Sequence, residues 1–276
     1  MTKFEKILAT AQEYSNRANG ILGLGFYDFA TGKNCYLQES TAFNTASMIK
    51  IYFLAELFRQ AEQGLVDLSQ RIAIAPGTAA KGSGVISRLH HPVEFSLYDH
   101  AELMMKFSDN TSTDVVLETI TRESLRKNLF DALNLQETVV GESRTEPGDI
   151  RRMGYFTTRT VTSPRDAVKV LRSLHDATLM TKESCQTALE VMTPRPGDAR
   201  IQKYLPKDVK VYRKPGSAGM ATNDAGLICT AKGDYALALF FPANDLSDDP
   251  KRLHAEEMLA LLSKDIYDIY MEDASC

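Results

Sequence analysis

Long hydrophobic runs are absent from this chain of 276 residues. A helix that crosses a bilayer needs about 20 predominantly apolar residues in a row, and no segment approaches that length. Residues 1–8 include an acidic side chain and no extended apolar stretch, so they do not resemble a secretory signal peptide. We therefore expect no membrane partner. We expect a cytoplasmic protein if Met1 is the native start, and a periplasmic or secreted one if a signal peptide was removed.

A basic excess is also absent. The chain has 32 Lys and Arg against 36 Asp and Glu, a net charge of -4, and its basic residues are spread along the sequence. This balance gives no reason to expect nucleic acid or an anionic membrane surface as a partner. Apolar residues make up 43% and charged residues 25%, as in ordinary globular proteins, and a chain of this length can bury a substantial core.

Closely spaced cysteine pairs are missing as well. The four cysteines are far apart and none belongs to a C-x-x-C pair, which argues against a zinc site. We expect free, mostly buried thiols in a reducing compartment, although the sequence leaves a disulfide open. His90 and His91 have no third ligand at a metal-site spacing. No metal and no organic cofactor is expected.

Strand patterns are present near both ends of the chain. Residues 21–29 and 35–37 flank a glycine-containing turn at 31–34, which predicts a hairpin. Three further strands are expected at residues 209–214, 223–230 and 235–241, the last two joined by a tight turn.

Helical periodicity occupies most of the remaining chain, where apolar residues recur at intervals of three and four. The expected helices cover residues 5–17, 47–63, 97–106, 111–119, 125–133, 164–175, 182–192 and 251–270. The polar stretch 141–160 is predicted to be a long loop, and loops of this length in compact domains are usually functional or disordered.

This order of elements predicts an α+β fold. An antiparallel sheet built from both chain ends, with flanking helices and an all-helical lobe, accounts for strands at the ends and helices between them. We expect a discontinuous α/β lobe from residues 1–46 and 195–276, a helical lobe from residues 47–194, and an active site between the two.

Ser47 and Lys50 form an S-x-x-K motif at the start of a predicted helix. Residues at this spacing share a helix face, so the amine can reach the serine hydroxyl. The start of a helix also presents backbone N–H groups to developing negative charge. Alone the motif is weak, because residues 124–127 repeat it on a helix where solvent exposure explains it, and because a serine at a helix start is often only a cap.

Two further motifs follow along the chain. Ser108-Asp109-Asn110 could relay a proton through its serine and bind a substrate amide through its asparagine, although it is also good capping chemistry before a helix. Lys214 opens the chain's one K-x-G sequence, at the end of a predicted strand. Its amine could hold a carboxylate, and Gly216 would let the backbone approach a ligand closely. A plain strand-to-turn exit is the alternative explanation.

Together these motifs resemble those of the class A β-lactamases, which carry S-x-x-K, S-D-N and K-T-G in this order. Phe43 stands four residues before Ser47, as in that family, and segments 82–86, 95–99 and 222–224 are similar to the family's. The resemblance covers residues 20–270 or so and implies the β-lactamase/transpeptidase-like fold.

The resemblance also implies roles for the motif residues. Ser47 would attack the acyl carbonyl, and Lys50 would act as general base, alone or through a water shared with a loop glutamate. Ser108 would pass a proton to the leaving nitrogen. The remaining implied roles are Asn110 for the substrate amide, Lys214 for its carboxylate, and the backbone N–H groups of Ser47 and Ser217 for the oxyanion hole.

The family needs one more residue, a loop glutamate that activates the deacylating water. Residues 144–147 match the family's R-x-E-P sequence and make Glu146 the candidate, with Glu142 as a competing one. A carboxylate can take a proton from water if its surroundings hold its pKa suitably. An exposed loop acid is the alternative for either residue.

Four departures from the family's pattern bear on function. Pro215 replaces a threonine or serine, which removes a hydroxyl and a backbone N–H near the substrate carboxylate. Ile150 stands where an asparagine anchors the catalytic water, and Thr160 where an aspartate pairs with the loop arginine. No arginine follows Lys214 on the next strand. The residues for acylation are thus present, while those for deacylation and carboxylate binding are incomplete.

The function expected from these residues is a serine hydrolase acting through an acyl-enzyme, in the first place a class A-like β-lactamase. The expected partner is a small-molecule β-lactam or an acyl-peptide. A D-Ala-D-Ala peptidase, an esterase or a serine-dependent glutaminase on the same fold is the first alternative, favoured by the missing export signal. A non-catalytic penicillin-binding-like domain is the second, favoured by Pro215, Ile150 and Thr160.

Overall fold

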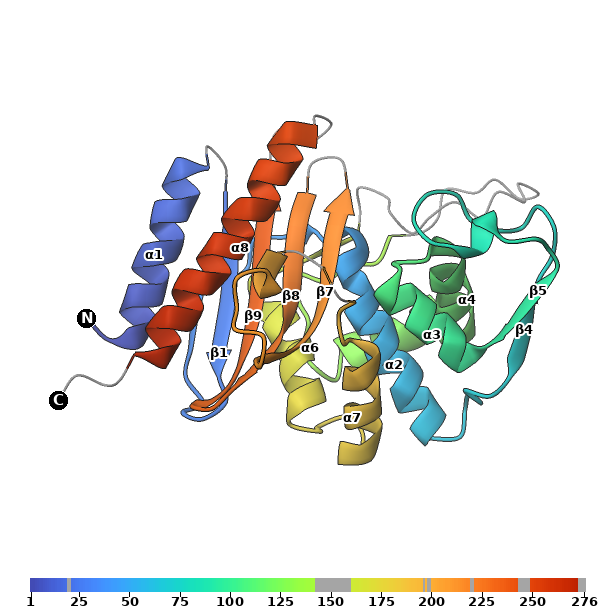
Figure 1. Cartoon of the computed structure of the whole chain (residues 1–276). Helices are drawn as coiled ribbons and strands as arrows, with labels where there is room; N and C mark the ends of the chain where they lie inside the picture. Colours follow the sequence, from blue (N-terminus) through green and yellow to red (C-terminus); the bar gives the residue numbers. More distant parts are fainter. Residues whose placement is uncertain are drawn as a thin grey trace.

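A computed structural model describes residues 1–18, 21–141, 160–195, 197, 200–218, 221–242 and 249–272. A central sheet separates the two terminal α-helices on one side from the remaining α-helices on the other (Figure 1). On the outer side of the sheet, α1 (Lys3–Arg17) and α8 (Asp249–Met271) run next to each other. None of the helices in the described ranges has both the length and the apolar character to span a membrane.

The central sheet has five strands, all antiparallel, in the order β2-β1-β9-β8-β7. The first two come from the start of the chain and the other three from its last third, so the expected sheet built from both ends is confirmed. Their bounds are Gly23–Asp28 for β1, Asn34–Leu37 for β2, Lys210–Ala218 for β7, Ala221–Thr230 for β8 and Gly233–Pro242 for β9.

Strand β9 lies at the centre of the sheet and illustrates how the sequence pattern forms two cores. Residues 235–240 are all fully buried. Ala236, Ala238 and Phe240 belong to the core shared with the inner helices, whereas Leu237 and Leu239 belong to the core beneath α1 and α8. Because successive side chains of a strand point to opposite faces, an apolar run places every residue in one core or the other.

The helices on the outer face are α1 (Lys3–Arg17) and α8 (Asp249–Met271), and α6 (Pro164–His175) packs on the inner face against β1 and β9. Helix α1 begins with a capping box in which Thr2 and Glu5 satisfy each other's backbone N–H groups. Ser163 caps α6, and Pro164 occupies its first turn. These local signals explain why the sequence predicts these helices within a few residues of their observed ends.

The rest of the chain between the strands is mainly helical. It contains α2 (Lys50–Glu62), α3 (Leu97–Lys106), α4 (Asn110–Ile120), α5 (Arg122–Ser124), α7 (Lys182–Val191) and three short turns, η1 (Ala46–Ile49), η2 (Ile86–Arg88) and the π-helical η3 (Leu125–Phe130). Two small sheets also lie here, β3 (Phe43–Asn44) with β6 (Val161–Thr162) and β4 (Arg71–Ile74) with β5 (Val93–Ser96). The lobe boundaries at 46/47 and 194/195 stay a prediction.

Two helices differ from the expected elements, and the first difference concerns the site. The helix expected from Ser47 begins instead at Lys50, after a 3-10 turn over residues 46–49. The expected helix over 125–133 is a π-helical turn that ends at Phe130. The small sheets were also missed, because pairs of two- and four-residue strands carry too little periodicity to be seen in a sequence.

Candidate active site

Ser47 lies in the turn η1, at the point where the chain passes from strand β3 to helix α2. Its side chain is largely buried. The preceding residue, Ala46, has a φ of 46°, a backbone conformation that side chains other than glycine adopt at a cost. Such strain persists only where the surrounding structure enforces it, and here it lies immediately before the predicted nucleophile.

Lys50 extends from the first residue of α2 into the interior and is completely buried. Its Nζ lies 2.8 Å from the carbonyl oxygen of Ser108, 3.0 Å from the Ser108 Oγ and 3.4 Å from the Asn110 Oδ1. The Ser108 Oγ in turn lies 2.8 Å from the Ser47 Oγ. The structure thus joins Ser47, Ser108 and Lys50 in one hydrogen-bonded chain, which links the first two motifs.

The pKa of Lys50 is lowered well below its usual value of 10.5, first because burial disfavours the charged form and second because the positive charge of Lys214 is nearby. The carboxylates of Asp109 and Asp114 oppose this shift. A lysine with a lowered pKa holds a neutral amine at lower pH and can accept a proton there.

The Ser108-Asp109-Asn110 segment both caps a helix and builds the site. Asp109 is the N-cap of α4 and accepts from the Ser112 N–H, so the capping explanation from sequence is correct for this residue. Ser108 has a φ of 53°, which turns its side chain and carbonyl toward Lys50. Asn110 donates through Nδ2 to the carbonyl of Lys81, 3.0 Å away. Capping and site geometry are therefore compatible in one segment.

Strand β7 brings the third motif against the turn that carries Ser47. A Cβ added to Gly216 would lie 2.5 Å from the Thr45 carbonyl oxygen and 2.9 Å from the Met48 backbone nitrogen. Only a glycine allows this approach of strand and turn. Lys214 is buried on the same strand, and its charge acts on Lys50. All three motifs therefore meet around Ser47.

We expect Gly216→Ala to destabilise the protein by about 1–3 kcal/mol, because its Cβ would push against backbone rather than a movable side chain. The variant should also lose most activity, since β7 would move away from η1. Urea unfolding and acylation rate measure both effects. Gly64→Ala is the control: Gly64 has a φ of 69° and no atoms within 4 Å of an added Cβ, so it should cost about 1 kcal/mol and keep activity.

The sequence analysis missed Arg200, which belongs to the turn η4 (Arg200–Gln202). Its guanidinium donates to the Ser217 Oγ, to the carbonyl oxygens of Gly216 at 3.1 Å and Asn223 at 2.7 Å, and to Glu256 on α8 at 2.7 Å. The strand after Lys214 carries no arginine. Arg200, from a different segment, instead lies next to β7. No motif marked it, because its position depends on how η4 packs on the sheet.

Residues 139–141 and 160–161, which flank residues 142–159 in the sequence, lie next to each other. Val139 and Val161 exchange backbone hydrogen bonds of 3.0 and 2.9 Å. The Gly141 N–H donates to the Thr160 hydroxyl at 3.4 Å. Thr160, which replaces an aspartate of the family pattern, therefore ties the two flanking stretches together through its own side chain.

Thr160 also contacts the turn that carries Ser47. Its carbonyl oxygen accepts from the Thr45 N–H at 3.1 Å, two residues before Ser47. The predicted base Glu146 lies outside the described residues, as do Glu142, Arg144, Pro147 and Ile150.

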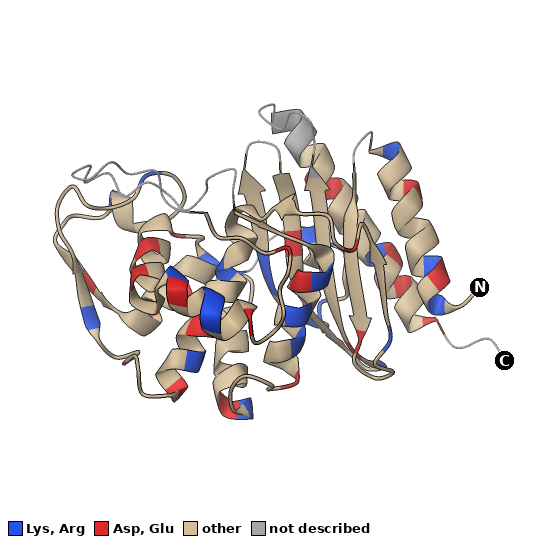
Figure 2. Ribbon diagram, turned by 180° about the vertical axis from the view of Figure 1, so that it is seen from behind, with Lys and Arg blue, Asp and Glu red and all other residues tan. Residues whose placement is uncertain are grey.

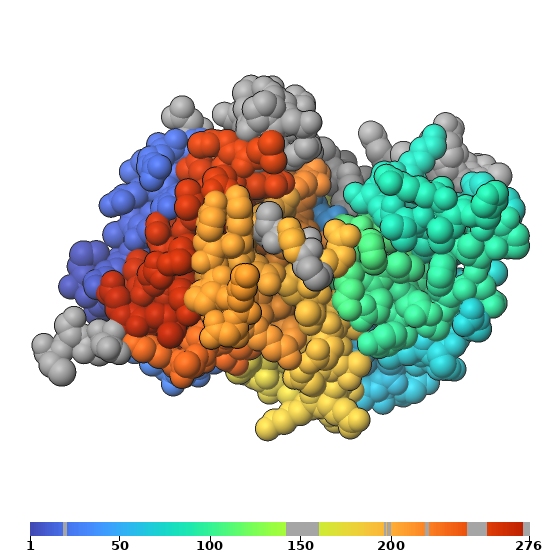
Figure 3. All heavy atoms as spheres, in the orientation of Figure 1, coloured from blue at the N-terminus to red at the C-terminus, as the bar shows by residue number. Residues whose placement is uncertain are grey.

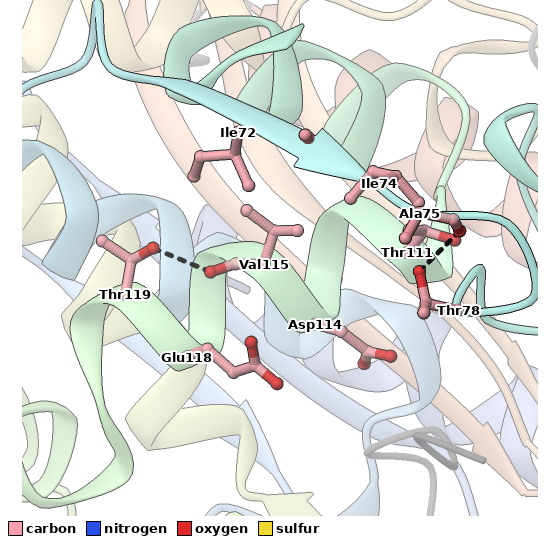
Figure 4. Close-up of a pocket in the computed structure, with 10 residues that line it drawn as sticks. Ile72, Ile74, Ala75, Thr78, Thr111, Asp114, Val115, Glu118 and Thr119 are labelled. Carbon is pink, nitrogen blue, oxygen red and sulfur yellow. Dashed lines mark hydrogen bonds between the residues drawn. The ribbon is translucent and has the colours of Figure 1, made fainter. Parts of the chain in front are cut away.

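A cavity of about 450 Å³ lies between β4 and α4 (Figure 4). Asp114 and Glu118 of α4 and the apolar side chains of Ile72 and Val115 line it. Asp114 connects it electrostatically to the site, because its charge acts on the pKa of Lys50. Within the described ranges, no group of three or more potential metal-ligating side chains is placed to hold an ion.

Comparison with known proteins identifies the family of this chain. The model of the Beta-lactamase2 family, described as the beta-lactamase enzyme family, matches residues 4–270. The chain belongs to this family. A beta-lactamase of Bacillus licheniformis is 25% identical over 230 residues, which cover 82% of this chain and 73% of that protein. The imipenem-hydrolyzing beta-lactamase of Enterobacter cloacae is 24% identical over 73% of this chain and 68% of its own length.

Solved structures of the family share the fold. The beta-lactamase from Sphaerobacter thermophilus superposes with a TM-score of 0.83 at 21% identity, over 98% of this chain and 99% of that one. A PBP-A mutant, solved as an acyl-enzyme complex with penicillin G, superposes with a TM-score of 0.80 at 23% identity, over 96% of both chains. The expected β-lactamase/transpeptidase-like fold is therefore confirmed.

Proposed function

We propose that this family member is a class A-like β-lactamase that opens β-lactams by acylation of Ser47 and then hydrolyses the acyl-enzyme. The observation that carries the proposal is the hydrogen-bonded chain from Ser47 through Ser108 to the buried amine of Lys50. The names of five curated relatives, four β-lactamases and one β-lactamase regulatory protein, support the substrate class.

In acylation, the neutral amine of Lys50 accepts the Ser47 proton as the Ser47 Oγ attacks the lactam carbonyl. Ser108 Oγ is within hydrogen-bonding distance of both groups, so it relays this proton and later delivers one to the leaving nitrogen. The backbone N–H groups of Ser47 and Ser217 stabilise the oxyanion, since Gly216 holds β7 against the turn of Ser47.

Substrate binding uses the polar groups around the hydrogen-bonded side chains of Ser47, Ser108 and Lys50. Lys214, buried on β7 beside the site, binds the substrate carboxylate. Asn110 orients the substrate amide, and its side chain is already positioned by the Lys50 amine and the Lys81 carbonyl. Pro215 supplies neither hydroxyl nor N–H, and the Ser217 hydroxyl accepts from Arg200, so the cationic groups carry most of the carboxylate recognition.

The test is time-resolved intact mass of the protein mixed with a penicillin, with penicillin loss followed in the same samples. A mass gain on Ser47 that decays while penicillin disappears supports a β-lactamase. The complete absence of an adduct and of turnover would contradict the proposal.

We expect Glu146→Gln to slow deacylation by about 10²–10⁴-fold, because the amide cannot take a proton from the attacking water. Acylation by penicillin should persist, so the acyl-enzyme should accumulate and remain visible by intact mass. Glu142→Gln is the matched control, being an acid four residues earlier in the sequence. If Glu142→Gln accumulates the adduct and Glu146→Gln does not, the assignment of the two glutamates must be exchanged.

A second candidate is an acyl-enzyme peptidase or esterase of the penicillin-binding type. Pro215 favours the esterase, because β7 offers fewer groups to a substrate carboxylate than the family pattern, and an ester need not carry one. The mass experiment separates the two candidates. A Ser47 adduct that persists without turnover would favour the peptidase or esterase, and acyl-D-alanyl-D-alanine peptides and esters would be the next substrates to test.

A further inference from the structure

The turn η1, which carries Ser47, keeps a strained backbone in the interior of the protein. Residues 46–49 are all buried, and the φ of Ala46 is 46°. The side chain of Thr45, the residue before the turn, makes no capping hydrogen bond within the described ranges. Because a strained conformation persists only where its surroundings enforce it, other groups must hold Ala46 in place.

Asn44 is the first of these groups. Its Oδ1 accepts from the Ala46 N–H at 2.9 Å. A short side chain that bonds a backbone N–H two residues further on forms an Asx-turn, which takes the place of a backbone turn. The bond holds the peptide on the N-terminal side of Ala46 in one orientation and so restricts the rotation that φ describes.

Asn223 of β8 holds Asn44 from the sheet. It is almost fully buried, and its Nδ2 donates to the Asn44 carbonyl oxygen at 2.7 Å. The Asn223 carbonyl oxygen in turn accepts from Arg200 at 2.7 Å. Arg200 also pairs with Glu256, and the segment of η4 (gold) lies against α8 (red) in Figure 3. The turn is therefore tied through two asparagines to the sheet and the helix that covers it.

Asn223 also belongs to a row of paired residues that accommodates residues 43–48. From β1 through β9 and β8 to β7 (Figure 1), the row consists of Gly23, Phe240, Asn223 and Gly216. The Phe43 ring stacks on Phe240, with 5.1 Å between the ring centroids, and a Cβ on Gly23 would lie 2.6 Å from that ring. Gly216 admits the turn at the other end. Between these packed ends, the single polar side chain of the row bonds the backbone of Asn44.

We propose that Asn44 and Asn223 are positioning residues for the nucleophile, which hold Ala46 in its strained conformation and thereby keep Ser47 in place. The inference rests on the proposed function, because it concerns acyl transfer to Ser47. The Ser47 Oγ must stay near the Ser108 Oγ, 2.8 Å away, and a misplacement of about 1 Å can cost about 10²-fold in rate. The Asn44 side chain accepts a hydrogen bond and the Asn223 side chain donates one, so the same substitution should affect them differently.

Aspartate keeps the acceptor of an asparagine and removes its donor. We therefore expect Asn44→Asp to acylate within about threefold of the wild-type rate and Asn223→Asp to acylate about 10²-fold more slowly. Asn44→Leu, which has a similar shape and no acceptor, should lose as much as Asn223→Asp. Stopped-flow kinetics with a penicillin should place both losses in the acylation step rather than in penicillin binding, since neither asparagine is among the proposed substrate-binding groups.

Asn128→Asp is the matched control. It adds the same negative charge and removes an amide of η3 that donates to the Ser124 Oγ at 2.7 Å. Acidic and basic residues are already interspersed over the helices (Figure 2), so this charge should leave acylation unchanged. Urea unfolding shows which variants are folded under the assay conditions, and if Asn223→Asp is not, the two Asn44 variants decide. A loss matched by Asn128→Asp, or equal rates in Asn44→Asp and Asn44→Leu, would overturn the assignment.

Hydrogen exchange of the Ala46 N–H, followed by NMR, does not depend on catalysis. The bond to Asn44 should protect this N–H in the wild type and in Asn44→Asp. Asn44→Leu should speed the exchange by at least about tenfold, whereas Asn128→Asp should not change it. Unchanged exchange in Asn44→Leu would show that Asn44 does not hold Ala46.

The two proposals fail separately. If penicillin leaves no adduct on the wild type and is not turned over, the proposed function fails, while the exchange of the Ala46 N–H still decides the positioning. If penicillin acylates Ser47 and both Asn44→Leu and Asn223→Asp acylate at the wild-type rate, the positioning alone fails.

Discussion

Ser47→Ala is expected to abolish acylation by penicillin, lowering the rate by at least about 10⁴-fold, because the variant has no nucleophile for the lactam carbonyl. Intact mass should show no adduct over a time in which the wild-type protein is fully acylated. The Lys50 and Ser108 groups would remain, but neither is placed to replace the missing oxygen at the end of the hydrogen-bonded chain.

Two controls make this result specific. The unfolding midpoint of Ser47→Ala should stay close to that of the wild type, since the change removes a single hydroxyl. Ser69→Ala removes an exposed hydroxyl that bonds Asp67 and should acylate normally. An adduct of unchanged yield on Ser47→Ala would show that another residue is acylated, and peptide mapping would then locate it.

Lys50→Met is expected to lower the acylation rate about 10³-fold, in the range that general-base catalysis contributes. In the wild type, acylation should fall as pH falls through the lowered pKa of Lys50, because protonation removes the base. Lys50→Met should lose this acidic limb of the pH profile. A profile that keeps the same limb in Lys50→Met would assign the base to another group.

Neighbouring charges should shift the limb in opposite directions. Asp114→Asn removes a carboxylate that raises the pKa of Lys50, so the limb should move to lower pH. Lys214→Gln removes a cation that lowers it, so the limb should move to higher pH. Stopped-flow acylation across pH measures both shifts. Shifts in the same direction would contradict the electrostatic assignment.

The same lysine should affect stability with a definite sign. Between the lowered pKa of the folded state and the usual 10.5, the unfolded chain binds a proton at Lys50 that the folded chain does not. The stability contributed by this residue therefore falls as pH falls through that range. The free energy of unfolding of the wild type, relative to Lys50→Met, should rise as pH approaches 10.5. Urea unfolding at neutral and alkaline pH measures the difference.

The elements of this fold could largely be predicted from sequence because their signals are local. The capping residues Thr2 and Ser163 begin helices, and the apolar run of β9 indicates a buried strand. Turn η1 could not be predicted, because the helical periodicity of α2 extends through it while the approach of Gly216 and the bond between Thr45 and Thr160 hold it in a tighter form.

Three of the candidate motifs could be named from residue type and spacing, and the structure places Ser108 within hydrogen-bonding distance of both Ser47 and Lys50. Arg200 could not be named in this way. It belongs to a short segment without a pattern of its own, and its contact with Ser217 is made by packing between segments.

The sequence by itself determined the strands and helices, the family and the residue types of the site, because periodicity, capping and motif spacing are properties of neighbouring residues. Only the tertiary structure decided the protonation tendency of Lys50. This tendency depends on burial and on charges from distant segments, such as Lys214 and Asp114, and these effects act through space rather than along the chain.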